Sequence, residues 1–166
     1  ASADSRTGAR LRAMCDGGLR SDECCEDALP HHLTMLHRVF AEADQFDIVH
    51  LHTGYLHLPL LWRAPVPSVT TLHDRLDLRD ITSIFKTFRR SHFVSISDAQ
   101  REPMRWLNWA GTIHHGLPSD LYELSERPEP YLAFVGRLSQ QKGIEAAVEI
   151  ARRTGMRLRV AAKIGR

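Results

Sequence analysis

Residues 131–143 constrain the fold more than any other part of the chain. They read YLAFVGRLSQQKG, an unbroken apolar run that ends at Gly136 and Arg137 and leads to Lys142 and Gly143. A short, wholly apolar run that stops at a glycine is typical of a strand buried on both faces, as in a parallel sheet. We therefore expect a strand here, followed by a turn and a helix.

The segment after this turn has the period of a helix. Apolar residues recur three, four and seven positions after Ile144, Gly155 stands where a helix stop is expected, and LRVAAKI resumes a strand pattern. These features predict one βαβ unit. Its strand-to-helix turn would hold Arg137 and Lys142 beside free helix N–H groups, which suits an anion such as phosphate. The alternative is that both cations are merely solvated.

Composition and charge narrow the class of protein. At 166 residues, 43% hydrophobic and 25% charged, the chain is an ordinary globular sequence with room for one full domain or parts of two. Residues 131–166 carry eight Lys/Arg against two Glu, a charge of +6 within a total of +2. This stretch favours an anionic partner. It lacks aromatic interleaving and any RNA-binding motif, so we expect no nucleic acid partner.

Cysteine usage and hydropathy bear on the compartment. Cys15, Cys24 and Cys25 are odd in number and lack CxxC spacing, which favours a reducing compartment over a disulfide framework. The opening ASADSRTGARLR has no apolar core of signal-peptide length, and no run reaches the roughly 18 apolar residues of a membrane span. We expect a cytoplasmic protein, with peripheral contact at the inner membrane face left open.

Helix and strand patterns alternate along the first part of the chain. Apolar periodicity predicts a helix over residues 29–43 and strands over residues 46–52, 68–73, 92–96 and 112–116. Ser97 and Gln100 form a capping-box pattern for a helix over residues 98–106, which Pro103 would shorten or bend.

This alternation predicts an α/β protein with parts of two Rossmann-like domains, each built on a parallel sheet. Residues 1–116 form the first part, residues 117–130 mix prolines and charges as a linker does, and residues 131–166 form the second. No strand opens the first part, and the second has only 36 residues. We therefore expect both domains to be incomplete and the chain to be a fragment.

Ten histidines raise the question of a metal site. His50 and His52 alternate along a predicted strand, so they share a face, as H-x-H zinc ligands do. With His57 they suggest a metal-dependent hydrolase as a less favoured alternative. The HxHxDH pattern of binuclear hydrolases fails, because Gly54 and Tyr55 stand where Asp and His are needed. We expect no metal site.

His73 has a position of its own. It ends a predicted strand, and ligands bind at the carboxyl ends of strands in open parallel sheets. The alternative is an ordinary turn in which Thr71 and Asp74 satisfy backbone groups. Spacing alone leaves both interpretations open.

Five segments together resemble the family-4 retaining glycosyltransferases, which have the GT-B fold. In order they are FDIVHLH, PVPSVTTLHD, FVSISDAQRE, TIHHGLPSDLY and YLAFVGRLSQQKG, and they cover nearly the whole chain. The most specific is FVGRLSQQKG, because the family pattern there is an apolar strand, GR, a few residues and KG. His115 stands where the family commonly has Asn, and Asp74 where small residues are frequent.

The resemblance implies two Rossmann-like domains facing across a cleft, the first for the acceptor and the second for a nucleotide-sugar donor. By matching motif positions, Arg137 and Lys142 would contact the donor diphosphate, and His73 would serve as a catalytic residue near the donor sugar. Gly116 and Gly136 would line the cleft. The implied reaction transfers a hexose to an acceptor hydroxyl with retention at the anomeric carbon, with no metal or other cofactor.

Other features of the family are missing from this sequence. Its glycine-rich first loop and the C-terminal half of its donor domain have no counterpart here, so we expect the fragment itself to be inactive. The alternative from another class is a noncatalytic α/β module that binds an anion or nucleotide. The donor sugar, the nucleotide, the acceptor and the oligomeric state are not indicated by the sequence.

Overall fold

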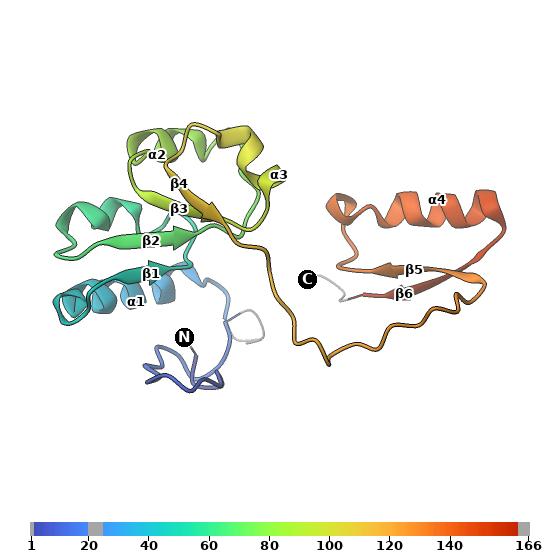
Figure 1. The fold of residues 1–166 in the computed structure, drawn as a ribbon, viewed down its shortest axis with the longest axis horizontal. Coiled ribbons are helices and arrows are strands. Elements are labelled where there is room, and N and C mark those ends of the chain that lie inside the picture. Colours follow the sequence, from blue (N-terminus) through green and yellow to red (C-terminus); the bar gives the residue numbers. More distant parts are fainter. Residues whose placement is uncertain (1, 20–24, 163–166) are drawn as a thin grey trace. The chain divides into compact units, whose positions relative to one another are not determined.

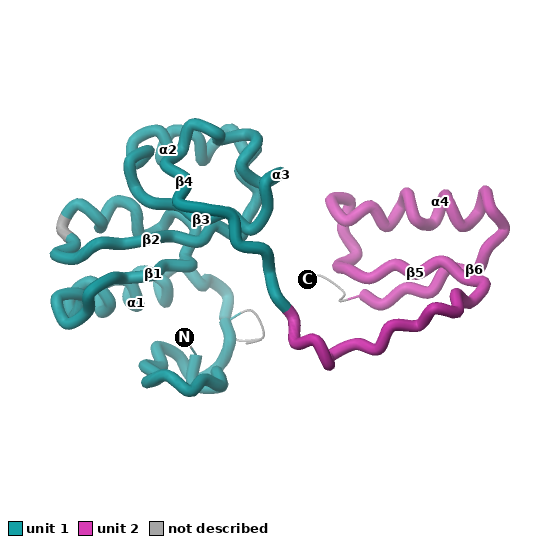
Figure 2. Tube along the Cα trace, viewed as in Figure 1, with its two compact units in different colours: residues 1–116 teal, residues 117–166 magenta. Residues whose placement is uncertain are grey.

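The computed structural model describes residues 2–19 and 25–162 of the chain (Figure 1). The chain divides into two compact units, Ala1–Gly116 and Leu117–Arg166 (Figure 2). Each unit is built around parallel strands, so the protein has the mixed α/β, Rossmann-like architecture that the alternating pattern predicts.

The first unit contains a four-stranded parallel sheet in the order β1-β2-β3-β4. Its strands are β1 (Val49–Leu51), β2 (Ser68–Thr71), β3 (His92–Ser95) and β4 (Trp109–Thr112). Neighbouring strands all pair in parallel, as the arrows of Figure 1 show. The segments that follow the four strands therefore all leave the sheet at one edge.

Helices precede β1 and connect the strands that follow it. They are α1 (Leu29–Ala41), α2 (Thr82–Thr87), α3 (Asp98–Arg101) and the 3₁₀ helices η1 (Ala43–Gln45), η2 (Leu58–Arg63) and η3 (Glu102–Met104). The predicted cap is confirmed, because the backbone N–H of Gln100 donates to Ser97 Oγ at 3.1 Å. The predicted shortening at Pro103 is confirmed as well, since α3 gives way to η3 there.

An aromatic core holds the first unit together. Phe93 in β3 is fully buried, and its ring meets Phe85 edge-on at 5.6 Å and Trp109 at 6.2 Å between centroids. The other buried members of this cluster are Leu58, Leu72, Leu76, Met104 and Leu107. Strand β3 is therefore the best-buried strand of the sheet, and its Phe93 ring buries a large apolar area in the core.

The predicted fourth strand is wrong in position. The sequence placed it over residues 112–116, whereas β4 ends at Thr112. The indole N–H of Trp109 donates to the Met104 carbonyl at 3.0 Å and its ring packs on Phe93, so the strand begins at this side chain. Ile113 is 66% exposed, and His115 lies on the segment that leaves the sheet.

The second unit is the predicted βαβ unit. It comprises β5 (Tyr131–Val135), the 3₁₀ helix η4 (Gln140–Lys142), α4 (Ile144–Thr154) and β6 (Arg157–Ala161). Strands β5 and β6 pair in parallel over five residues each, and Gly155 ends α4 in the left-handed region, with φ +66°. The predicted last strand runs on to residues 163 and 164, which lie outside the described residues, as does Cys24.

The second unit has little buried surface. Among residues 117–162 none is fully buried, and Val135 in β5 is 83% exposed. Residues 117–130 contain no helix or strand, in agreement with the linker pattern. In the described part of the chain, no helix combines the length and apolarity needed to cross a membrane.

Candidate functional site

Histidines gather where the strands of the first unit end. His52 follows β1 directly, His73 lies two residues beyond β2, and His115 lies three residues beyond β4. Since the four strands are parallel, their carboxyl ends bring these rings to one edge. His50, inside β1, shares the face of His52, and their ring centroids are 4.4 Å apart, as the alternation predicts.

His73 is joined to two of its neighbours. His52 Nδ1 and His73 Nε2 lie 2.8 Å apart in a hydrogen bond. The ring of His73 also stacks on that of His115, with centroids 5.3 Å apart and an interplanar angle of 8°. His52 and His73 are both exposed residues, and no hydrogen bond to His73 Nδ1 is formed within the described part of the chain.

Gln100 fixes the backbone that carries His73. Its amide Nε2 donates to the carbonyls of Leu72 at 3.0 Å and Asp74 at 2.8 Å, the two residues that flank His73. Its Oε1 accepts from the Ile96 N–H at 2.9 Å. One side chain at the start of α3 therefore ties the end of β2 to the end of β3. The capping pattern revealed the helix start, but the bonds to Leu72 and Asp74 cross 26 or more residues and leave no local signal.

A shallow pocket lies beside the backbone segment that Gln100 holds. Its volume is about 420 Å³, and its wall includes His73, Asp74, Ser97 and Gln100. At the rim Arg75 binds Asp77 through two hydrogen bonds of 2.5 Å, and this contact lowers the pKa of Asp77 and raises that of Arg75. The pocket thus has both donors and acceptors along its wall.

His57 has a structural role. It is fully buried, its Nδ1 is bonded to Thr53 Oγ1 at 2.9 Å, and its Nε2 to Thr70 Oγ1 at 2.8 Å. Burial lowers its pKa from 6.5 to about 4, so the ring is neutral at physiological pH.

As the structure places them, the three histidines of the hydrolase alternative are not grouped as metal ligands among the described residues. Both nitrogens of His57 are occupied by threonine hydroxyls, and His50 Nε2 is bonded to Thr71 Oγ1 at 2.8 Å. Across residues 2–19 and 25–162, no three or more His, Cys, Asp or Glu side chains are grouped to hold a metal ion.

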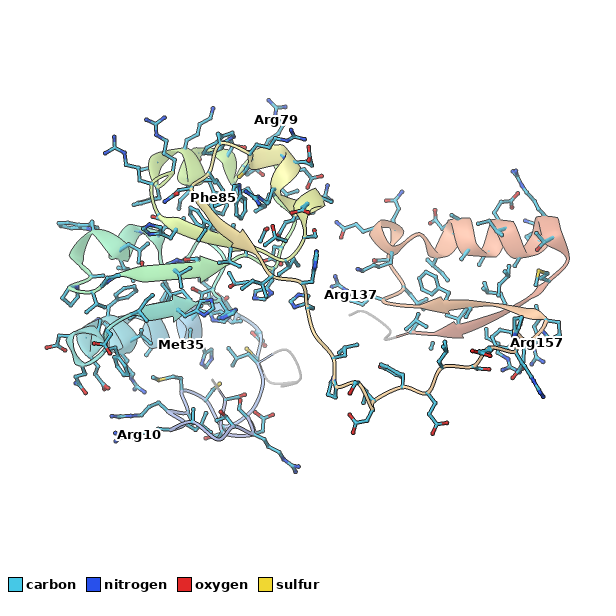
Figure 3. The ribbon with its side chains drawn as sticks, viewed as in Figure 1. Arg10, Met35, Arg79, Phe85, Arg137 and Arg157 are labelled. Atoms are coloured by element: carbon cyan, nitrogen blue, oxygen red, sulfur yellow. The ribbon has the colours of Figure 1, made fainter. Side chains whose placement is uncertain are left out.

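The second unit carries the other predicted residues on the turn between β5 and α4. Gly136 donates its N–H to the Ala161 carbonyl at 3.1 Å, which closes the end of the two-stranded sheet. Arg137 projects from the carboxyl end of β5 (Figure 3). Lys142 ends η4, and its Cβ would lie 3.9 Å from a Cβ placed on Gly136. Both cationic residues thus belong to one compact turn.

Neither cation is paired with an acid of the described residues. Arg137 and Lys142 are exposed, and within the described part of the chain neither side chain forms an ion pair or hydrogen bond. Gly143, with φ +75°, then turns the chain into α4, whose first intrahelical hydrogen bond runs from Ala147 to the Gly143 carbonyl at 3.0 Å. The N–H groups of residues 144–146 precede that bond and belong to the positive end of the helix dipole.

Ser139 is a residue of this turn that the sequence did not single out. Its hydroxyl oxygen is buried and has no hydrogen-bond partner among the described residues. A buried hydroxyl without a partner is costly, and such groups are uncommon in native structures. No pattern in the sequence indicates it, because a serine beside a helix start is ordinarily read as a cap.

The two glycines assigned to the cleft differ in their surroundings. A Cβ on Gly116 would meet nothing within 4 Å, so no packing within its own unit requires glycine there. A Cβ on Gly136 would touch the Phe134 ring at 3.7 Å, an ordinary contact.

A scan against models of protein families finds no match to this chain. A search of curated proteins also finds no match.

Proposed function

We propose that this chain carries the donor-diphosphate turn and the sugar-side histidine of a retaining glycosyltransferase. Such an enzyme moves a hexose from a nucleotide sugar to an acceptor hydroxyl. The observation that supports it most is the turn between β5 and α4, where Arg137 and Lys142 have no acidic partner among the described residues and stand beside a helix N-terminus. The order of the five sequence segments is the second support.

The chemistry assigned to the turn is stabilisation of the leaving group. As the glycosidic bond to the diphosphate breaks, negative charge grows on the phosphate oxygens. Arg137 offers a planar fork of donors, Lys142 a compact charge, and α4 its positive end. Contacts that strengthen as this charge develops lower the barrier, and this step needs no metal ion.

His73 is assigned to the sugar in the first unit. It lies at the carboxyl edge of the sheet, its ring is exposed, and Gln100 fixes its backbone on both sides. A ring nitrogen held in this way suits a hydrogen bond to a sugar hydroxyl. The compartment we propose is the cytoplasm, since Cys15 and Cys25 are free thiols.

Calorimetric titration with UDP, GDP and ADP tests the donor assignment. Arg137→Ala and Lys142→Ala should each weaken diphosphate binding by roughly 10- to 100-fold, the effect of losing one charge-assisted contact. Arg152→Ala is the matched control, because Arg152 is an exposed arginine of the same unit at the far end of α4. Equal affinities for all four proteins would exclude the assigned role.

A turnover assay distinguishes a glycosyltransferase from a noncatalytic binding module. With a nucleotide sugar bound, release or transfer of the hexose supports the glycosyltransferase, and its loss in Arg137→Ala ties it to the turn. Tight diphosphate binding with no sugar release, with or without an added acceptor, would favour the noncatalytic anion-binding module.

A further inference from the structure

We propose that His52 is a positioning residue for His73. It accepts the Nε2 proton of His73 at its own Nδ1 and so leaves His73 Nδ1 as a bare acceptor facing outward. No feature of the sequence pattern assigns this role, because an H-x-H pair on a strand is commonly interpreted as a metal-binding pair.

The distance between the rings requires a shared proton. His52 Nδ1 and His73 Nε2 are 2.8 Å apart, a hydrogen-bond length, so one nitrogen carries a proton and the other does not. In a neutral ring the second nitrogen then has the opposite role. The pair therefore presents one donor and one acceptor at its outer nitrogens, and the direction of the inner bond decides which ring presents which.

The protonation preference of imidazole sets that direction. A neutral histidine side chain favours the proton on Nε2 over Nδ1, and only one arrangement lets both rings keep this form. In it His73 Nε2–H donates to His52 Nδ1, His52 keeps its own proton on Nε2, and His73 Nδ1 is left unprotonated. The reverse direction would place both rings in their less favoured form.

Neighbouring groups keep the two rings in place. The ring of His52 lies against that of His50, which is itself bonded to Thr71, and the ring of His73 stacks on His115. Burial, followed by the nearby His50 and His73, lowers the pKa of His52, which favours its neutral form as an acceptor.

The consequence for chemistry rests on the function proposed above. A bare Nδ1 on His73 accepts a hydrogen bond, so it selects a hydroxyl donor such as a sugar O–H. It would not serve an acceptor-only group such as a phosphate oxygen. This separates the task of the histidine from that of the cationic turn in the second unit.

Nitrogen-15 NMR of the ligand-free protein tests the inference directly. At a pH where both rings are neutral, the wild type should show a proton on His73 Nε2 with a coupling across the hydrogen bond to His52 Nδ1. His73→Gln assigns the signal. A proton on His52 Nδ1 instead, or no coupling between the rings, would overturn the proposal.

Three variants separate positioning from simple packing. His52→Leu should speed exchange of the His73 Nε2 proton by about tenfold, the factor expected for loss of one hydrogen bond. His52→Asn places an amide where Nδ1 stood and should restore slow exchange. His115→Leu replaces the stacked ring without removing either bonded nitrogen and should change exchange much less than His52→Leu does. Equal exchange in all four proteins would contradict the role.

The result is independent of glycosyl transfer. The measurement uses no donor or acceptor, so a protein that fails to bind UDP can still show the coupled pair. Conversely, the protein could bind UDP in a way that depends on Arg137 and yet show no coupling between the two rings. That result would support the proposed function and contradict the role of His52.

Discussion

At the scale of single residues, burial divides the histidines of the sheet edge into two kinds. His57 is buried, and both of its ring nitrogens are hydrogen-bonded to threonine hydroxyls. His52 and His73 are exposed, and each uses only one ring nitrogen in the hydrogen bond between them. Sequence spacing does not distinguish them, because His52 and His73 end predicted strands and His57 follows one of these strands by five residues. The difference between an enclosed and an exposed histidine therefore arises from the fold.

His57 predicts how stability depends on pH. Its pKa is about 4 in the folded protein and 6.5 in the unfolded chain, so the unfolded state binds more protons between these values. The free energy of unfolding should fall as pH drops through this window, by roughly 3 kcal/mol from this group alone. Urea unfolding at pH values across the window measures the slope.

The matched variants for this prediction are His57→Leu and His37→Leu. The first removes the titrating group and should flatten the pH dependence. The second replaces an exposed histidine of α1 and should keep the wild-type slope. Wild type and His57→Leu with the same slope would show that His57 is protonated equally in both states.

At the scale of elements, Gln100 links the end of β2 to the start of α3. Gln100→Glu keeps an oxygen for the Ile96 N–H but replaces the donor toward the Leu72 and Asp74 carbonyls with a charged acceptor. We expect a loss of about 1–3 kcal/mol in local stability, seen as faster amide exchange over residues 72–75. Gln45→Glu, an exposed position in η1, should change nothing there. Unchanged amide exchange in Gln100→Glu would mean that the hydrogen bonds of Gln100 to Leu72 and Asp74 do not stabilise this backbone segment.

Helices and strands could be predicted from the sequence wherever a local pattern of residues determines them. The apolar run before Gly136 and the helical repeat after it produce β5 and α4, and Ser97 marks the start of α3. Boundaries failed where a distant contact decides them. The predicted strand over residues 46–52 shrinks to β1, because the pairing with β2 begins only at Val49, opposite Ser68. Phe46 and Ile48, which precede this pairing, are more than half exposed.

The residues of the candidate site divide in the same way. The placement of the two cations on one turn could be predicted because Gly136 and Gly143 bracket them between a strand and a helix. The His52 to His73 bond could not, since it joins residues 21 positions apart through a parallel register that the sequence does not display. The buried hydroxyl of Ser139 depends likewise on packing around the turn.

At the scale of the whole molecule, the two units differ in how much they bury. The first encloses an aromatic cluster around Phe93, whereas residues 117–162 contain no fully buried side chain. Hydrogen exchange followed by mass spectrometry should find the slowest amides in β2 and β3 and much faster ones in β5, β6 and α4, since exposed hydrogen bonds open locally at little cost. Equal protection in both units would mean that the second unit is stabilised by more than the contacts described.

The positive charge of the second unit underlies the central claim, which is that a diphosphate binds at the turn between β5 and α4. Nuclear magnetic resonance tests this claim most directly. In a titration of the ¹⁵N-labelled protein with UDP, the amide signals of residues 136–146 should shift first and furthest, and Lys142→Ala should suppress those shifts. Shifts confined to the first unit, or none at millimolar UDP, would contradict the assignment of a diphosphate to the turn between β5 and α4.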